Sequence, residues 1–180
     1  MKIILVRHGE SESNAKKSDE KDSNLTKKGR VQAEHLARKL KNEKISKIYT
    51  SNLIRAKQTG DIISKIIRVP VKTGFEELNE YEGKHLRSFW RMFFNQRLKK
   101  LKRLLNKISR EKEKKKKILI VAHGITNKII LSYFLKINKK KLLQFHQKNT
   151  CINIIKWEPD FKNWSLKCMN DISHLPEELK

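Results

Sequence analysis

Residues 3–10 read IILVRHGE, an apolar run that stops at a cation, a histidine and a glycine. Consecutive apolar residues rich in β-branched side chains, ended by a chain breaker, are typical of a buried central strand in an α/β sheet. Ligands of such sheets bind beyond the carboxyl ends of the strands. We therefore expect Arg7 and His8 at a ligand-binding edge, with Gly9 allowing a close approach. Because short patterns recur by chance, an ordinary surface loop remains an open interpretation of this stretch alone.

A second stretch repeats the pattern more than a hundred residues later. Residues 118–124 read ILIVAHG, again a continuous apolar run followed by His-Gly. The carboxyl ends of parallel strands meet at one edge of a sheet. The repetition therefore predicts that His8 and His123 lie at the same edge, and it favours a functional interpretation of both.

The rest of the chain alternates between helix-like and strand-like patterns. Four helices are expected, over residues 26–40, 51–66, 86–108 and 124–135. Four further strands are expected, over residues 45–50, 69–73, 151–157 and 164–169, the last two as a hairpin. This alternation predicts one domain, residues 1–180, of the α/β class: a three-layer α/β/α sandwich with a mostly parallel sheet and a helical cap inserted between about residues 84 and 116.

The composition is strongly basic, with 43 Lys and Arg against 19 Asp and Glu and a formal charge of +24. Such a charge favours anionic partners, namely phosphate esters, nucleic acid or an acidic membrane surface. The lysines are spread along the chain, which favours a compositional bias over a dedicated nucleic-acid or membrane site. Cys151 and Cys168 form neither a disulfide framework nor a zinc spacing. With no signal peptide or membrane span in the sequence, a cytoplasmic location is expected.

The charged residues expected at the sheet edge suit a phosphoryl group. Arg55 would lie near the start of a helix, where a cation is unfavourable unless an anion sits beside it. Zinc could bind two histidines, but Arg7 and Arg55 would repel a cation. Arginines bind phosphoryl oxygens bidentately, and a neutral imidazole such as that of His8 is a good nucleophile toward phosphorus. A carboxylic acid from residues 75–83, the densest acidic cluster, could protonate a leaving alkoxide.

Several motifs, in order along the chain, resemble the histidine phosphatase (phosphoglycerate mutase-like) superfamily. They are RHGE at 7–10 with Asn14, LTxxGxxQA at 25–33, SxxxRAxQT at 51–59, LxE at 78–80 and AHG at 122–124. The ending NDxxHL at 170–175 is similar to that of the phosphatase-type members.

This resemblance implies a role for each matched residue. His8 is the nucleophile that becomes phosphohistidine, and Glu80 donates a proton to the leaving group and then activates water. No metal or cofactor is required. The resemblance assigns phosphoryl and substrate binding to Arg7, Asn14, Arg55, His123 and Gly124, and it implies a small phosphorylated substrate.

The sequence departs from the superfamily pattern in two places. After Glu80 the acidic segment is shortened, so Glu77 and Glu82 remain alternative proton donors. The basic segment 86–117 resembles nothing specific, although this region covers the pocket and determines the substrate in the superfamily. The leading hypothesis is a phosphomonoesterase. The alternatives are a phosphoglycerate mutase, a phosphoprotein phosphatase, and a non-catalytic module that binds nucleic acid or acidic lipid.

Overall fold

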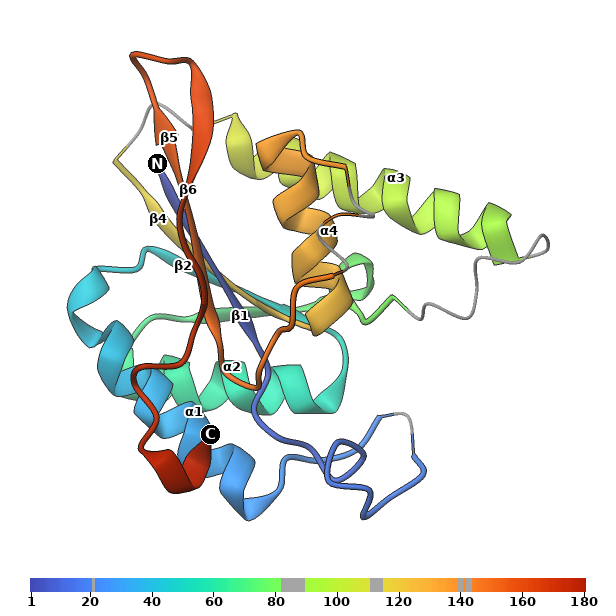
Figure 1. Ribbon diagram of the computed structural model, residues 1–180, viewed down its shortest axis with the longest axis vertical. Helices are drawn as coiled ribbons and strands as arrows, with labels where there is room; N and C mark the ends of the chain where they lie inside the picture. The colour runs from blue at the N-terminus through green and yellow to red at the C-terminus, as the bar shows by residue number, and fades with distance from the viewer. Residues whose placement is uncertain (21, 82–89, 111–114, 139–140, 142–143) are drawn as a thin grey trace.

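A central sheet organises the computed structural model, which describes residues 1–20, 22–81, 90–110, 115–138, 141 and 144–180 (Figure 1). In this part of the chain six strands pair in the order β3-β2-β4-β1-β5-β6. Their bounds are Lys2–Arg7 for β1, Lys47–Ser51 for β2, Val71–Phe75 for β3, Lys117–Ala122 for β4, Ile152–Glu158 for β5 and Asn163–Asp171 for β6. Strands β1 to β4 run parallel, and the β5–β6 hairpin is antiparallel. The prediction of a mostly parallel sheet is confirmed.

Helices cover both faces of this sheet (Figure 1). Helices α1 (Lys27–Leu40) and α2 (Ile54–Ile67) lie on one face, and α3 (Trp90–Ser109) and α4 (Gly124–Leu135) lie on the other. This three-layer arrangement explains the uninterrupted apolar runs of β1 and β4, because both faces of each strand are covered by helices. In β1, Ile3 and Leu5 face α3 and α4, and the next residues along, Ile4 and Val6, face α1 and α2.

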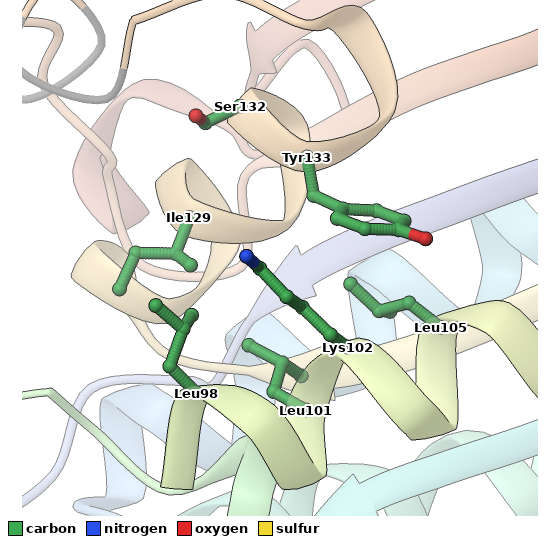
Figure 2. Close-up of a pocket in the computed structure, with 7 residues that line it drawn as sticks. All are labelled: Leu98, Leu101, Lys102, Leu105, Ile129, Ser132 and Tyr133. Atoms are coloured by element: carbon green, nitrogen blue, oxygen red, sulfur yellow. The ribbon is translucent and has the colours of Figure 1, made fainter. Parts of the chain in front are cut away.

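The C-terminal half of helix α3 packs against the sheet. Leu101, Leu105 and Ile108 are buried in the same core cluster as β1 and β4. Where α3 meets α4 the apolar side chains leave a cavity of about 280 Å³, across which Lys102 extends toward α4 (Figure 2). Residues 86–89 of the expected helix lie outside the described residues, so the expectation of a cap over the pocket stays a prediction.

The start of helix α2 differs from the one expected, for an identifiable reason. Helix α2 begins at Ile54 and not at Ser51, because Ser51 still pairs in β2. The backbone N–H of Ile54 donates to Asp22 Oδ1 at 2.7 Å, so a side chain from the loop between β1 and α1 caps helix α2. The two ends of that loop are paired, because Ser11 forms an isolated β-bridge with Leu25. Short 3-10 helices lie at Lys41–Glu43, Glu76–Leu78 and Glu177–Leu179.

Two glycines let the loop after β1 lie against the start of α1. A Cβ atom on Gly29 would stand 2.0 Å from the carbonyl oxygen of Glu10, and one on Gly9 would stand 2.4 Å from the carbonyl oxygen of Gly29. Only two residues without side chains allow this contact. The described helices include none that is long and apolar enough to cross a membrane.

Candidate active site

The carboxyl ends of the neighbouring strands β1 and β4 bring two histidines together. The ring centroids of His8 and His123 lie 5.0 Å apart with the ring planes tilted by 58°. Both side chains are almost completely buried. The sheet edge therefore joins the two residues that the sequence paired, and it removes their rings from bulk water.

Hydrogen bonds define the protonation of His8. Its Nδ1 lies 2.7 Å from the carbonyl oxygen of Gly9, which can only accept, so Nδ1 carries the proton. Its Nε2 accepts a hydrogen bond from Arg55 Nε at 3.2 Å, so Nε2 presents a lone pair. This is the tautomer required of a nitrogen nucleophile at Nε2.

A different chain of hydrogen bonds defines His123. The backbone N–H of Asn52 donates to Asn79 Oδ1 at 2.9 Å, which identifies that atom as the amide oxygen. Ser51 Oγ lies 2.8 Å from the same oxygen and must donate to it. The Ser51 oxygen is then an acceptor for His123 Nε2 at 2.8 Å. The neutral ring therefore has a bare lone pair on Nδ1, a buried atom with no hydrogen-bond partner among the described residues.

Burial and nearby cations keep both rings neutral. Burial lowers the pKa of His8 well below its ordinary value, and the charges of Arg7 and Arg55 lower it further. Burial also lowers the pKa of His123 well below its ordinary value, with further contributions from His8 and from the charges of Arg55, Arg7 and Arg97. The free site therefore holds two uncharged imidazoles between two guanidinium groups.

The two arginines reach the site from different elements. Arg55 lies in the first turn of α2 and is 8% exposed, and its Nη1 is 3.7 Å from Asp22 Oδ1. Arg7 ends β1 and donates through Nη1 to the carbonyl oxygen of Gln147, which precedes β5. The Nε of Arg7 is buried and, within the described part of the chain, has no hydrogen-bond partner. Burial lowers the pKa of both guanidinium groups, and the Glu80 carboxylate partly offsets this effect.

The Glu80 carboxyl group lies at the N-terminus of α4. Its Oε1 accepts hydrogen bonds from the backbone N–H groups of Tyr81, Ile125 and Thr126, at 3.2, 3.1 and 3.4 Å. Burial raises the pKa of Glu80 above its ordinary value, against the opposing charge of Arg7 and the bonds from α4. Since Oε1 is occupied by donors, a proton on this carboxyl group belongs on Oε2.

Arg97 of α3 ties the backbone around Glu80 to the helical layer. Its Nη1 donates to the carbonyl oxygen of Glu80 at 3.0 Å, its Nη2 donates to that of Asn79, and its guanidinium carbon lies 3.9 Å from the centre of the Tyr81 ring. Thr126 Oγ1 also donates to the Asn79 carbonyl, at 2.8 Å. The sequence did not identify Arg97, because it is one of many cations on an amphipathic helix and no motif distinguishes it.

The remaining predicted site residues are Asn14, Gly124 and the alternative proton donors Glu77 and Glu82. Asn14 is exposed, and its Oδ1 accepts from Asn149 Nδ2 at 3.2 Å, the same amide that donates to the carbonyl oxygen of His8. Gly124 begins α4 beside Arg7. The charge of Glu77 acts on Tyr81 and Arg97, whereas the charge of Glu80 acts on Arg7 and Arg55. Glu82 lies outside the described residues.

Comparison with known proteins identifies the family of this site. A sequence model of the histidine phosphatase superfamily (branch 1) matches residues 3–93 and 91–172. The chain belongs to the histidine phosphatase superfamily. The described residues of this superfamily member include no group of three or more His, Cys, Asp or Glu side chains that could hold a metal ion. Membership makes the chain an enzyme of the phosphatase or mutase type.

Individual relatives differ in their names and in how much of the chain they match. The chain is 31% identical over 201 residues to the Hydrogenobacter thermophilus protein named "Putative phosphoserine phosphatase 2", with 96% of this chain and 97% of that protein aligned. It is 48% identical to the 2,3-bisphosphoglycerate-dependent phosphoglycerate mutase of Thermoplasma acidophilum, but over 77 residues, or 41% of this chain and 38% of the mutase.

A solved structure shares the whole architecture. The phosphoserine phosphatase of Entamoeba histolytica, in complex with 3-phosphoglyceric acid, superposes with a TM-score of 0.76 at 24% identity. The alignment covers 97% of this chain and 99% of that chain. At this level of identity the comparison shows the α/β/α fold.

Proposed function

We propose that the chain hydrolyses small phosphomonoesters through a phosphohistidine intermediate on His8. The observation that carries the proposal is the Nε2 lone pair of a neutral, buried His8, which accepts a hydrogen bond from Arg55 Nε. Arg7, His123 and the Glu80 carboxyl group surround it. Cations for the phosphoryl oxygens, a nitrogen nucleophile and a carboxylic acid are the groups that phosphoryl transfer needs.

In the first step the Nε2 lone pair of His8 forms a bond to phosphorus while the bond from phosphorus to the ester oxygen breaks. Arg55 must move its Nε–H from Nε2 to a phosphoryl oxygen, which both frees the nucleophile and stabilises the transferring group. Glu80 gives the proton on Oε2 to the leaving oxygen, so the alcohol departs uncharged. The enzyme is left with phosphohistidine and a Glu80 carboxylate.

In the second step the Glu80 carboxylate takes a proton from water. The water oxygen then bonds to phosphorus and the N–P bond of phosphohistidine breaks, releasing inorganic phosphate and restoring both His8 and protonated Glu80. The same proposal assigns binding of the phosphoryl group or its ester to Arg7, Asn14, Gly124 and the bare Nδ1 of His123. Because Nδ1 can only accept, the bound phosphoryl group must bring a proton, or His123 must gain one.

Hydrolysis of p-nitrophenyl phosphate tests this proposal. His8→Ala should abolish turnover, while His35→Ala, a change in α1 away from the site, should leave it within about threefold of the parent, as distant surface changes usually do. Turnover by His8→Ala at the parental rate would refute the assignment of the nucleophile. Conversion of 3-phosphoglycerate to its 2-isomer, dependent on a bisphosphate primer and without release of phosphate, would instead favour the mutase alternative.

A further inference from the structure

We propose that Gln147 and Asn153 are positioning residues of the active site: their paired side-chain amides fix the carbonyl oxygen that holds the Arg7 guanidinium group. The inference rests on the proposed function, because it concerns how Arg7 is presented to the phosphoryl group. Neither amide belongs to a motif identified in the sequence, and neither takes part in the mechanism above.

The first of these amides lies in the interior of strand β5. Asn153 is completely buried and pairs with Leu5 of β1 in the sheet. Its Nδ2 donates to the carbonyl oxygen of Leu5 at 3.3 Å, and its Oδ1 accepts from the backbone N–H of Asn170 in β6 at 3.0 Å. Because a carbonyl can only accept and a backbone N–H can only donate, these two bonds fix which atom of the Asn153 amide is nitrogen and which is oxygen.

The orientation of Asn153 determines that of Gln147. Asn153 Nδ2 donates to Gln147 Oε1 at 2.9 Å, and Gln147 Nε2 donates back to Asn153 Oδ1 at 3.0 Å. Cys151 Sγ also donates to Gln147 Oε1, at 3.3 Å. Gln147 is 4% exposed and lies before β5, outside any helix or strand. The reciprocal amide pair therefore anchors an irregular part of the chain to the sheet.

The anchored residue holds Arg7 through its backbone. Arg7 Nη1 donates to the carbonyl oxygen of Gln147, so the position of that oxygen sets the direction of the planar guanidinium group. The Nε–H of Arg7 is buried and has no hydrogen-bond partner among the described residues, which leaves it as a donor for a phosphoryl oxygen. A guanidinium group that is already fixed loses little conformational entropy when the ligand binds.

The same segment also contacts the nucleophilic residue. The backbone N–H of Thr150 and the Nδ2 of Asn149 donate to the carbonyl oxygen of His8, at 3.2 and 3.1 Å. Net stability alone does not explain a buried amide pair here, because two apolar side chains of the same shape would stabilise the fold about as well. What the amides add is direction, since each bond fixes the orientation of its partner.

The order of the Arg7 Nε–H group, measured by nuclear magnetic resonance, tests the contact directly. Its signal is identified by its absence from Arg7→Lys. The order parameter should be about 0.85 in the parent and should fall below about 0.6 in Gln147→Met, which keeps the side-chain length and removes the amide. Gln144→Met, the same change at an exposed position, should leave the order as in the parent. Asn153→Leu should act like Gln147→Met, which remains the test if a change inside β5 prevents folding.

Steady-state kinetics connect the contact to turnover. Gln147→Met should lower kcat/KM for p-nitrophenyl phosphate about tenfold, the size expected when a contact of a charged group is lost. Arg7→Lys keeps the charge but has no planar fork for the carbonyl oxygen to orient. Adding Gln147→Met to Arg7→Lys should therefore lower kcat/KM by less than about twofold further.

Two results would overturn the inference. One is an Arg7 Nε–H group that is equally ordered in the parent and in Gln147→Met. The other is the same loss of kcat/KM with and without Arg7→Lys, as expected of a residue that only supports the fold. A parent that does not hydrolyse p-nitrophenyl phosphate would overturn the proposed function instead, and a fall in Arg7 order in Gln147→Met would still support the amide pair as the group that holds Arg7.

Discussion

Replacing Glu80 with glutamine removes the proton that the proposed reaction uses twice and changes little else. Glu80 Oε1 accepts bonds from the backbone N–H groups of Tyr81, Ile125 and Thr126, and the carbonyl oxygen of a glutamine side chain can accept the same bonds. The variant should therefore fold like the parent. Its effect on turnover reports proton transfer to the leaving group and from water.

The size of the effect depends on the leaving group. General acid catalysis contributes about 10²–10⁴-fold, which corresponds to about 2.7–5.5 kcal/mol of barrier. We expect a loss of this size for glycerol 3-phosphate, whose alkoxide needs a proton in order to leave. Nitrophenolate leaves without one, so Glu80→Gln should still be phosphorylated quickly by p-nitrophenyl phosphate. Hydrolysis of phosphohistidine then becomes slow, because no carboxylate activates the water.

Rapid-quench kinetics with p-nitrophenyl phosphate should show a burst, because phosphorylation is fast and hydrolysis of phosphohistidine is slow. Glu80→Gln should release nitrophenol equal to the enzyme concentration and then turn over slowly. For glycerol 3-phosphate, its steady-state kcat/KM should fall by at least about a hundredfold. Glu77→Gln is the matched control and should stay within about threefold of the parent for both esters. Equal loss in the burst and steady phases would refute the two-step role of Glu80. A larger loss in Glu77→Gln would assign the acid to Glu77.

Four further outcomes follow from the same geometry. With the parent enzyme, kcat/KM for alkyl esters should fall as pH rises through the raised pKa of Glu80, and this limb should be missing in Glu80→Gln pH profiles. Binding of inorganic phosphate should take up about one more proton in the parent than in His123→Gln. Calorimetry in buffers of different ionisation enthalpy measures this uptake, and equal uptake by the two proteins would contradict a bare lone pair on His123 Nδ1. Arg97→Lys keeps the charge but cannot bridge the Asn79 and Glu80 carbonyl oxygens. For glycerol 3-phosphate, kcat should therefore fall about tenfold while KM stays within about threefold of the parent. Equal changes in kcat and KM would make the role of Arg97 merely structural. Gly29→Ala places a Cβ 2.0 Å from the Glu10 carbonyl oxygen and should lower the free energy of unfolding by about 3 kcal/mol, which lowers Tm by about 6–12 °C. The control is Gly124→Ala, whose Cβ meets nothing nearer than 3.8 Å and which should melt close to the parent.

The sequence predicts the centre of the fold well because burial on two faces leaves a simple pattern. Strands β1 and β4 are covered by helices on both sides, so every residue from Ile3 to Val6 and from Ile118 to Val121 must be apolar. The two residues that follow each run, Arg7-His8 and Ala122-His123, then reach the sheet edge by geometry alone. This is why His8 and His123 could be paired without any knowledge of the intervening chain.

The parts of the site that the sequence does not predict depend on contacts between distant elements. Asp22 caps α2 from a loop that has no apolar pattern, and the start of α2 therefore could not be located from periodicity. The environment of Glu80 is made by the N-terminus of α4 and by Arg97 of α3. A charge on an amphipathic helix is usually solvated, and nothing local separates Arg97 from its neighbours. The tautomer of His123 likewise depends on a chain of bonds through Ser51 and Asn79.

The most direct test of the account is to locate the phosphoryl group during turnover. Glu80→Gln is mixed with p-nitrophenyl phosphate, quenched in alkali to preserve phosphohistidine, digested, and mapped by mass spectrometry. We expect one added, acid-labile phosphoryl group on the peptide that contains His8, and none when His8→Ala is combined with Glu80→Gln. A phosphoryl group on any other residue, or turnover by the parent with no phosphoenzyme at any time after mixing, would contradict nucleophilic attack by His8.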